Sequence, residues 1–310
     1  MTAHRLLERV TRNTPLGIRF WDPAGATSLV DGLVVEVFLR ANPRSRTRAV
    51  PNRSGVYVAH TLAAFDGAGS PPGPGLREWE GSDAGADELW AVATRRYRIE
   101  VTDPLGRFVP FAFDADLPAR GLLTWLAPWL SPPQPVALPG EPGSPPRLLL
   151  ERIPLFSAPA RPVPAPLAVV RAQLREQGAE GPAAWSLLAV SIDGEVRGLG
   201  LADREGRVAV MFPYPEPPRM TLGSPPEARN DFTWPVELAA FVPAAPSPPG
   251  PAPEIPDLAE VLGALAVPRA VVESLGSPPA PPLRLSYRQE LVARTAGAAG
   301  ADAGTLWIAP

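Results

Sequence analysis

The chain has 310 residues, of which 45% are hydrophobic, with a formal net charge of -3 and a pI near 5.6. This slightly acidic balance, without any basic block, argues against nucleic acid or an anionic membrane surface as the main partner. The chain contains no cysteine, which excludes disulfide bonds, thiolate catalysis and Cys-ligated zinc.

The first part of the chain predicts an N-terminal arm over 1–13 and then a β-domain over 14–118. Short apolar runs such as LVVEVFL and VYVAHTL alternate with turn residues, and the run RFVPFAFDADL spaces its phenylalanines among small or polar residues. The Gly-, Pro- and Ser-rich stretch 66–86 is expected to form an exposed loop.

Residues 119–166 predict a proline-rich connection between two domains. Its segment GLLTWLAPWL carries Trp125 and Trp129 four residues apart, so the two rings share a face if the segment is helical. They either cap the first domain or form a partner-binding patch. The following SAPARPVPAPL is expected to be an extended, polyproline-like tether.

A second β-domain is predicted over 167–310. The stretch WSLLAVSIDGEVRGLGLADREGRVAVMF reads as three antiparallel strands, with turns at Asp193-Gly194 and at Asp203 to Gly206. A helical insertion is expected over 254–276, where Asp257 would cap a first helix and RAVVESLG would form a second. Strands are expected again over 283–295 and 305–310.

Two short patterns recur along the chain. An Asn or Asp precedes Gly by three residues, ahead of an apolar run, at three places: Asn52 to Gly55, Asp103 to Gly106 and Asp203 to Gly206. These pairs are expected to make structural hairpin turns. The tetrapeptide Gly-Ser-Pro-Pro begins at four glycines: Gly69, Gly143, Gly223 and Gly276. It is either loop filler or a proline-rich docking motif.

Residues that could carry chemistry are few. The two histidines, His4 and His60, have no second histidine at metal-binding spacing. Asp114 and Asp116 point to one face of a strand, where they either chelate a cation, act as paired acids or form a solvated strand end. No nucleophile elbow or phosphate-binding loop occurs, so the sequence predicts a protein without enzymatic activity, cofactor or metal.

The segments Gly198-Leu-Gly-Leu-Ala-Asp203 and Gly206-Arg-Val-Ala-Val-Met-Phe212 resemble the central hairpin of carboxypeptidase-regulatory-like, or transthyretin-like, domains. FWDPAG, PNRSGVYV and EVTDPLGRFVPFAFDADLP are similar to a diverged second copy. This resemblance implies an all-β chain of two immunoglobulin-like antiparallel β-sandwich domains, with a short helical insertion in the second. The Gly198-Leu-Gly200 pair is then a strand kink and not a dinucleotide site.

FWDPAG near the start and PLFSAPARPVP between the domains are also similar to accessory proteins encoded with contractile injection systems, which are phage-tail-like particles. That resemblance implies a non-catalytic structural or assembly subunit of the baseplate or cap region. Its partners would be other protein subunits, such as tube, sheath or baseplate components, and neither nucleic acid nor an inserted membrane.

An alternative function is a free β-sandwich module that binds a ligand or carbohydrate. Its candidate binding residues are the same aromatic side chains that could bind a partner protein: Trp79, Trp90, Trp125 and Trp129. A third hypothesis, catalysis by Asp114 and Asp116, rests only on their spacing. The N-terminus lacks a signal-peptide pattern, so synthesis is expected in the cytoplasm, with the chain either staying there or joining a released or membrane-attached particle.

Overall fold

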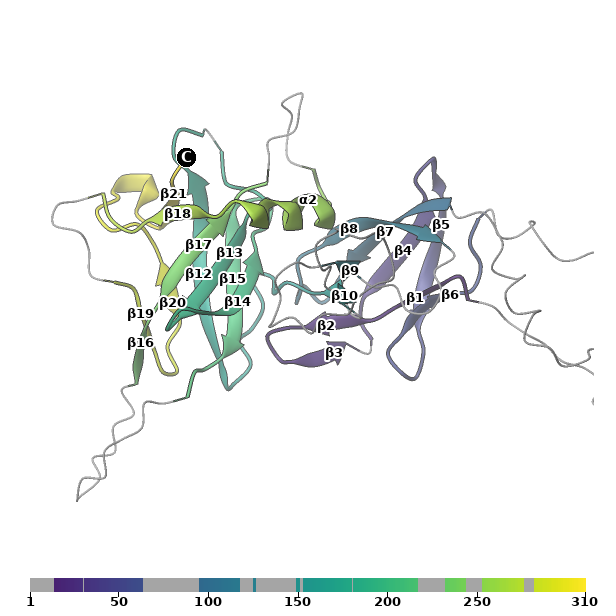
Figure 1. Ribbon diagram of the computed structural model, residues 1–310, viewed down its shortest axis with the longest axis horizontal. Coiled ribbons are helices and arrows are strands. Elements are labelled where there is room, and N and C mark those ends of the chain that lie inside the picture. The colour runs from purple at the N-terminus through teal and green to yellow at the C-terminus, as the bar shows by residue number, and fades with distance from the viewer. Residues whose placement is uncertain are drawn as a thin grey trace, which may run out of the picture. The chain divides into compact units, whose positions relative to one another are not determined.

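The computed structural model describes ten stretches of the chain: 14–29, 31–63, 95–117, 125–126, 149–150, 153–179, 181–216, 232–243, 253–275 and 282–310. The predicted all-β class is confirmed, because these residues form strands in sandwich-like sheets together with one short α-helix (Figure 1). No helix in these stretches is both long and apolar enough to cross a membrane. The predicted arm 1–13 and the four Gly-Ser-Pro-Pro segments lie outside the described residues.

The chain divides into two compact units, each assembled from separate stretches. One unit takes the described parts of 1–19, 34–100 and 114–153, and the other takes those of 20–33, 101–113 and 154–310. Two stretches from the first half of the chain, 20–33 and 101–113, thus group with its second half. The strands in these stretches therefore make contacts with residues that are far away in the sequence.

A six-stranded sheet with the order β1-β6-β5-β4-β7-β8 dominates the N-terminal half. Its strands are β1 (Leu16–Ile18), β4 (Val34–Leu39), β5 (Asn42–Pro51), β6 (Tyr57–Ala59), β7 (Arg95–Thr102) and β8 (Phe111–Leu117). Strand β7 shows why the sheet has two distinct faces: Tyr97, Ile99 and Val101 are buried, while the residues between them are polar.

The polar face of this sheet carries a cross-strand arginine–carboxylate ladder, formed by Glu36, Arg40, Arg46, Arg98, Glu100 and Asp114. Arg46 Nη1 lies 2.6 Å from both Glu36 Oε2 and Glu100 Oε2. Asp114 accepts from Arg98 at 3.3 Å and also pairs with Arg40. Opposite charges on neighbouring strands suit a solvated sheet face.

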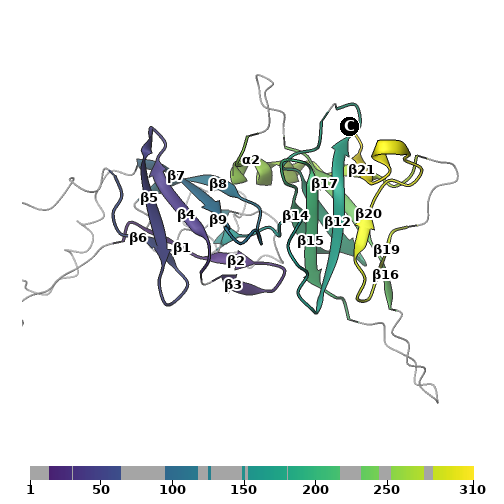
Figure 2. The ribbon, with the colours of Figure 1, turned by 180° about the vertical axis from the view of Figure 1, so that it is seen from behind.

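The second unit is built around an eight-stranded arrangement with the order β14-β13-β17-β18-β21-β12-β15, in which β20 also pairs β12. The strands are β12 (Leu167–Glu176), β13 (Leu187–Ile192), β14 (Glu195–Leu201), β15 (Arg207–Pro213), β17 (Glu237–Phe241), β18 (Arg269–Val272), β20 (Leu291–Ala293) and β21 (Thr305–Ile308). Most ladders are antiparallel as predicted, but β12 pairs in parallel with β20 and β21. Figure 2 shows β12 running between β15 and β20.

The predicted three-stranded meander is correct for its first hairpin and wrong for its second. Strands β13 and β14 pair antiparallel across Asp193-Gly194, whose φ angles of 55° and 74° suit a tight two-residue turn. Strand β15, however, pairs with β12, from Leu167↔Pro213 to Gln173↔Arg207. The chain therefore leaves the β13–β14 ladder after the second turn.

Two glycines explain how β14 lies against β15 without pairing. A Cβ atom on Gly198 would come within 2.8 Å of Val210 Cγ1, and one on Gly200 within 2.8 Å of Val208 Cγ2 and 2.9 Å of the Ala209 carbonyl oxygen. Glycine in a strand commonly marks such a close approach. The register of this hairpin shifts between Val190 and Ser191 of β13, which face Gly198 and Val196, so Arg197 on β14 is the extra residue.

The three recurring Asx–Gly pairs form turns of one design. In each turn the Asx side chain accepts backbone N–H groups two and four residues later, at 2.7–3.2 Å. The backbone carbonyl of the Asx accepts the N–H of the Gly. The glycines take φ of 65° to 77°, which a side chain would disfavour. The turns are Asn52 to Gly55, Asp103 to Gly106 and Asp203 to Gly206.

Only half of the predicted helical insertion is helical. Helix α2 (Leu258–Gly263) begins as predicted, with the Asp257 carboxylate accepting the Ala259 N–H at 2.9 Å and the apolar side of the helix buried. The predicted second helix is wrong, because residues 269–272 form strand β18 between β17 and β21. Adjacent β-branched residues, Val271 and Val272, with a partner strand on each side favour the strand.

The predicted strand over 283–295 is interrupted. Strand β19 (Arg284–Ser286) pairs with β16 (Thr233–Pro235), and a turn separates it from β20. The short 3-10 helices η1 (Ala264–Ala266) and η2 (Gly300–Asp302) complete this part of the chain. The insertion is tied to its own unit, since Trp185 Nε1 donates to the Pro253 carbonyl oxygen at 3.0 Å.

The segment just before the predicted tether is packed and hydrogen-bonded. Strand β11 (Ile153–Pro154) joins β2 (Phe20–Asp22) and β3 (Thr27–Leu29) in a three-stranded sheet, and the Leu155 N–H donates to the Trp21 carbonyl oxygen at 2.8 Å. Residues 153–157 are buried. Of the predicted extended tether, 157–167, this buried run includes only Ser157. Earlier in the connection, β9 (Trp125–Leu126) pairs with β10 (Leu149–Leu150).

Candidate functional site

Four aromatic side chains form a closed cycle of ring contacts in the second unit. The Tyr214 ring centroid lies 4.9 Å from that of Tyr287 and 5.7 Å from that of Trp234. Phe232 closes the cycle, at 6.4 Å from Trp234 and 6.3 Å from Tyr287. These separations are typical of favourable aromatic pairs. We call this set the aromatic cycle.

Short strands hold the aromatic cycle together. Strands β16 and β19 pair antiparallel, with Trp234 opposite Leu285, and the Tyr287 N–H donates to the Phe232 carbonyl oxygen at 2.9 Å. Tyr214 follows directly after β15. Trp234 is buried at 5% exposure, whereas the other three residues are half-buried. The cycle therefore joins the core to the surface.

Arg288 extends the aromatic cycle outward. Its guanidinium carbon lies 5.3 Å from the Tyr287 ring centroid, and its backbone N–H donates to the Tyr214 hydroxyl oxygen at 2.9 Å. Arg288 has a φ of 61°, which is uncommon for a residue with a side chain and often marks functional turns. Burial raises the pKa of the Tyr214 hydroxyl, so it remains neutral at physiological pH.

The charges beside the aromatic cycle are unbalanced. Within the part of the chain that the structure describes, neither the Arg284 nor the Arg288 guanidinium group has a carboxylate partner. Both side chains are exposed. Aromatic rings next to arginine are enriched at protein–protein interfaces, where the rings supply buried area and the guanidinium supplies directional bonds.

A second cluster holds together the two segments FWDPAG and PLFSAPARPVP. Arg161 binds both oxygens of Asp22, with Nη2 at 2.6 Å from Oδ2 and Nη1 at 3.2 Å from Oδ1. Nη1 also donates to Ser157 Oγ at 2.9 Å, and the guanidinium carbon lies 4.8 Å from the Phe108 ring centroid. We call these four residues the Asp22 cluster.

The Asp22 cluster has a structural role, because its charged groups are buried and paired with one another. The side chains of Asp22 and Arg161 are only 7% and 11% exposed, and the Ala24 N–H donates to Asp22 Oδ1 at 3.1 Å. A bidentate arginine–carboxylate pair gives strong geometric definition. Because every oxygen of Asp22 already accepts a hydrogen bond, the cluster holds the chain segments in place and presents no free reactive group.

The suggested acid pair is not a pair of free carboxylates. Asp114 is bound by Arg98 and Arg40, and Asp116 by Arg96 at 3.3 Å. His60 is exposed, with Nδ1 at 3.4 Å from Thr14 Oγ1. Among the described residues, no three acidic, histidine or cysteine side chains gather to hold a metal ion. His4 lies outside these residues.

The four tryptophans that the sequence singled out cannot be joined into one site here. Trp79, Trp90 and Trp129 lie outside the described residues, and of Trp125 only the backbone is described, paired with Leu150 in the β9–β10 ladder. The sequence did not single out the aromatic cycle. Its four rings come from three separate stretches, so no local spacing indicates that they meet.

Comparison of the chain with models of protein families, with curated proteins and with solved structures finds no match.

Proposed function

We propose that this chain is a non-catalytic structural subunit of a large protein particle, and that it docks onto a neighbouring subunit through the aromatic cycle and Arg288. The observation that carries this proposal is the aromatic cycle, in which the rings of Tyr214, Phe232 and Tyr287 are half-buried. Beside the Tyr287 ring lies the Arg288 guanidinium, which has no carboxylate partner in the described part of the chain. Such anchors dominate the binding energy of protein interfaces.

The charges at this surface define the partner's chemistry. Arg284 and Arg288 would bind carboxylates of a partner protein around an apolar contact. Such complementary charges favour an acidic partner and repel a basic one. The partner is therefore a neighbouring subunit that presents acidic side chains beside an apolar patch. The Tyr214 hydroxyl is already bonded to the Arg288 backbone, which holds the surface in shape before binding and lowers the entropic cost of association.

The finer proposal is that the particle is a phage-tail-like contractile injection system. Its support is the resemblance of FWDPAG and PLFSAPARPVP to accessory proteins of such systems. In the fold these segments meet through the Asp22–Arg161 pair and the Leu155–Trp21 backbone bond. These contacts hold segments that are far apart in the sequence in fixed positions, as we expect in a structural component of a particle.

Native purification from the encoding cells, followed by sizing and electron microscopy, tests both levels of the proposal. Co-elution with other chains in a particle far larger than 32.9 kDa supports the assembly role, and tube- or sheath-like images support the finer proposal. Elution of the whole population as a free monomer overturns both. A large particle of another shape overturns only the finer one.

A matched pair of charge reversals then tests the docking surface. Arg288→Glu reverses the charge beside the aromatic cycle, while Arg204→Glu reverses an exposed arginine in another turn of the same unit. We expect Arg288→Glu to release the subunit from the particle and Arg204→Glu to leave it bound, because like charges at an interface cost several kcal/mol. Equal behaviour of the two variants contradicts docking at this surface.

A further inference from the structure

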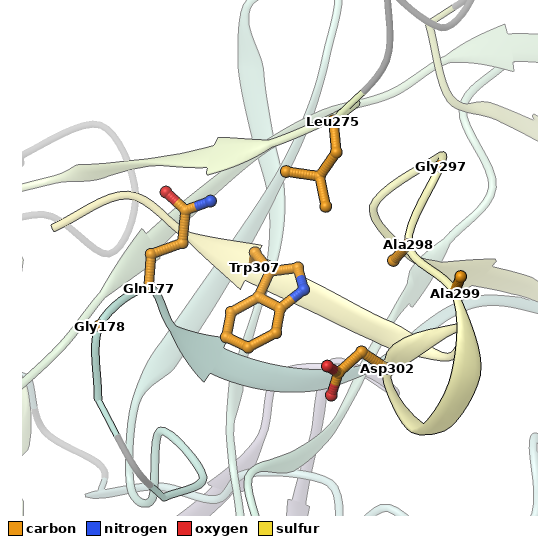
Figure 3. Close-up of a pocket in the computed structure, with 8 residues that line it drawn as sticks. All are labelled: Gln177, Gly178, Leu275, Gly297, Ala298, Ala299, Asp302 and Trp307. Carbon is orange, nitrogen blue, oxygen red and sulfur yellow. The ribbon is translucent and has the colours of Figure 1, made fainter.

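A hollow of about 420 Å³ opens on the outer side of the second unit's sheet, and the indole ring of Trp307 lies at its centre (Figure 3). This volume lies in the lower part of the range of about 300–1,000 Å³ that is typical of small-molecule sites. The hollow is distinct from the aromatic cycle, with which it shares no residue.

Strand alternation turns the Trp307 ring away from the core. Strand β21 lies between β18 and β12, and its residues Leu306 and Ile308 are buried, while Trp307 between them is half-buried. The Trp307 backbone N–H donates to Thr295 Oγ1 at 2.9 Å. The ring is therefore carried by a strand that is paired on both sides, and a rigid element of this kind suits a binding site.

Apolar groups form one side of the hollow. The Leu275 side chain, in a residue that is 53% exposed, and the methyl groups of Ala298 and Ala299 stand near the indole (Figure 3). Their loops are hydrogen-bonded to one another, since the Leu275 N–H donates to the Ala296 carbonyl oxygen at 2.9 Å. An exposed leucine beside an open tryptophan face offers apolar area that a ligand could bury.

Polar groups flank the indole on two sides. Figure 3 shows the Asp302 carboxylate and the Gln177 carboxamide on opposite sides of the ring. Asp302 Oδ1 accepts from Arg175 Nη1 at 3.2 Å, with both side chains 41% exposed, and within the described stretches its other oxygen has no hydrogen-bond donor. Among the described residues the Trp307 indole N–H has no hydrogen-bond partner, which adds a free donor.

We infer that this hollow binds a neutral sugar, with one hexopyranose ring stacked on Trp307. The C–H face of such a ring is apolar and flat, and its hydroxyl groups at the rim both donate and accept hydrogen bonds. Stacking would bury the C–H face on the indole, while hydroxyls donate to Asp302 and exchange bonds with Gln177. The inference does not depend on the proposed assembly role.

The local charges favour a neutral ligand over an ionic one. Arg175 and Asp302 form an ion pair at 3.2 Å, so the two charges offset each other and neither a cation nor an anion gains a strong attraction at the hollow. A polyhydroxylated neutral molecule does not need such an attraction, and it matches the mixture of one carboxylate, one amide and one indole N–H.

NMR with three neutral disaccharides, maltose, cellobiose and N,N'-diacetylchitobiose, tests this site on the full chain. Saturation transfer to the sugar C–H protons and a shift of the Trp307 indole resonance, assigned by its loss in Trp307→Phe, should appear with Kd near or below about 10 mM. Pull-down on insoluble cellulose and chitin, run in parallel, distinguishes polymer binding from binding of the free sugar.

Two leucines give a matched control. Leu275→Ala shortens the wall of the hollow, whereas Leu105→Ala shortens a leucine that is 69% exposed elsewhere. We expect Leu275→Ala and Asp302→Asn each to weaken binding at least about threefold, Trp307→Ala to abolish it, and Leu105→Ala to leave it unchanged. Binding that survives in folded Trp307→Ala, equal effects of the two leucine variants, or no binding of any sugar tested, free or polymeric, overturns the inference.

Discussion

Arg46 and Arg161 perform the same chemistry in two different settings. Each guanidinium binds carboxylate oxygens at 2.6 Å and lies near the face of a phenylalanine ring, Phe38 for Arg46 and Phe108 for Arg161. The Arg46 side chain is 40% exposed, whereas those of Arg161 and its partner Asp22 are 11% and 7% exposed. Distance alone therefore does not say how much a pair contributes.

The difference lies in what happens when one partner is removed. Water replaces a lost partner on the exposed ladder, so the remaining carboxylates of Glu36 and Glu100 stay solvated. At the Asp22 cluster water has little access, and removing Arg161 would leave a buried carboxylate without its counterion. We therefore expect the two sites to differ severalfold in their effect on the free energy of unfolding.

The largest effect is expected from truncation of the buried pair. Arg161→Ala should lower the free energy of unfolding by about 3–5 kcal/mol, because it leaves Asp22 charged and poorly solvated. Urea unfolding followed by tryptophan fluorescence measures the loss. A loss of stability no larger than that for an exposed arginine would contradict the larger contribution expected of the buried Asp22–Arg161 pair.

A double variant separates the cost of an orphaned charge from the value of the pair. Asp22→Leu combined with Arg161→Met replaces both ions by apolar side chains, so no buried charge remains. We expect this double variant to be more stable than Arg161→Ala alone. If it is equally unstable or worse, then the pair itself and its bond to Ser157 supply the stability.

Two turns of one design extend the comparison, because their aspartates differ in burial. The Asp103 side chain is fully buried against Arg107, which is 29% exposed, while Asp203 is 16% exposed and its partner Arg207 is 58% exposed. Asp103→Ala should cost about 2 kcal/mol and Asp203→Ala about 1 kcal/mol, because hydrogen bonds to a buried charged group contribute more. Parallel urea titrations compare the two, and the reverse order would contradict the dependence on burial.

The pH dependence of the free energy of unfolding below pH 4 tests the Asp103 turn without truncating its side chain. Burial alone would raise the pKa of Asp103, but hydrogen bonds from the Arg107 side chain and the Arg107 and Leu105 backbone outweigh it, so the pKa falls below its ordinary 3.8. A lowered folded-state pKa gives stability that is present above the unfolded-state pKa and lost as the pH falls through the folded-state pKa.

Asp103→Asn should therefore be less stable than the parent protein at pH 7, and the gap should narrow as the pH falls below about 4. Chemical unfolding at a series of pH values measures this convergence. The parallel variant Asp203→Asn serves as the more exposed reference. A gap that is constant down to pH 2 would show that the Asp103 carboxylate does not titrate with folding.

Local signals in the sequence predicted the turns and the caps well. The Asp193-Gly194 hairpin and the Asp257 cap depend on neighbouring residues, and both form as expected. The partner of β15 could not be predicted in this way, because Gly198 and Gly200 lead β14 to pack against β15 while β12 pairs with it. Strand pairing across the chain is decided by packing that no short pattern reports.

The two proposed binding surfaces show the same limit of prediction from the sequence. The alternation of Leu306, Trp307 and Ile308 in the last strand could have indicated that the indole points away from the core. The aromatic cycle carries no such signal, since its rings come from three separate stretches, at Tyr214, at 232–234 and at Tyr287, that only the folded chain brings together. Proline-rich composition predicted a tether after residue 157, although Arg161 supplies the charge that holds this segment against Asp22.

The smallest effect is expected on the exposed ladder. Arg46→Ala should lower the free energy of unfolding by no more than about 1 kcal/mol, since the guanidinium contributes modest ion pairs and a contact of 4.3 Å with the Phe38 ring. The ion-pair part should fade in about 0.5 M NaCl, where charges at a solvated surface are screened. Arg46→Lys keeps the positive charge but loses the guanidinium contact with the Phe38 ring, so it separates the effect of the charge from that of the ring contact.

The salt dependence distinguishes the two arginines more sharply than the size of either effect. Screening ions reach Arg46 but not the Asp22–Arg161 pair, so salt should reduce the cost of Arg46→Ala while leaving that of Arg161→Ala nearly unchanged. Urea unfolding of both variants at low and high salt provides the measurement. Equal salt sensitivity would mean that solvent enters the Asp22 cluster, and the contrast between the two regions would then be one of degree.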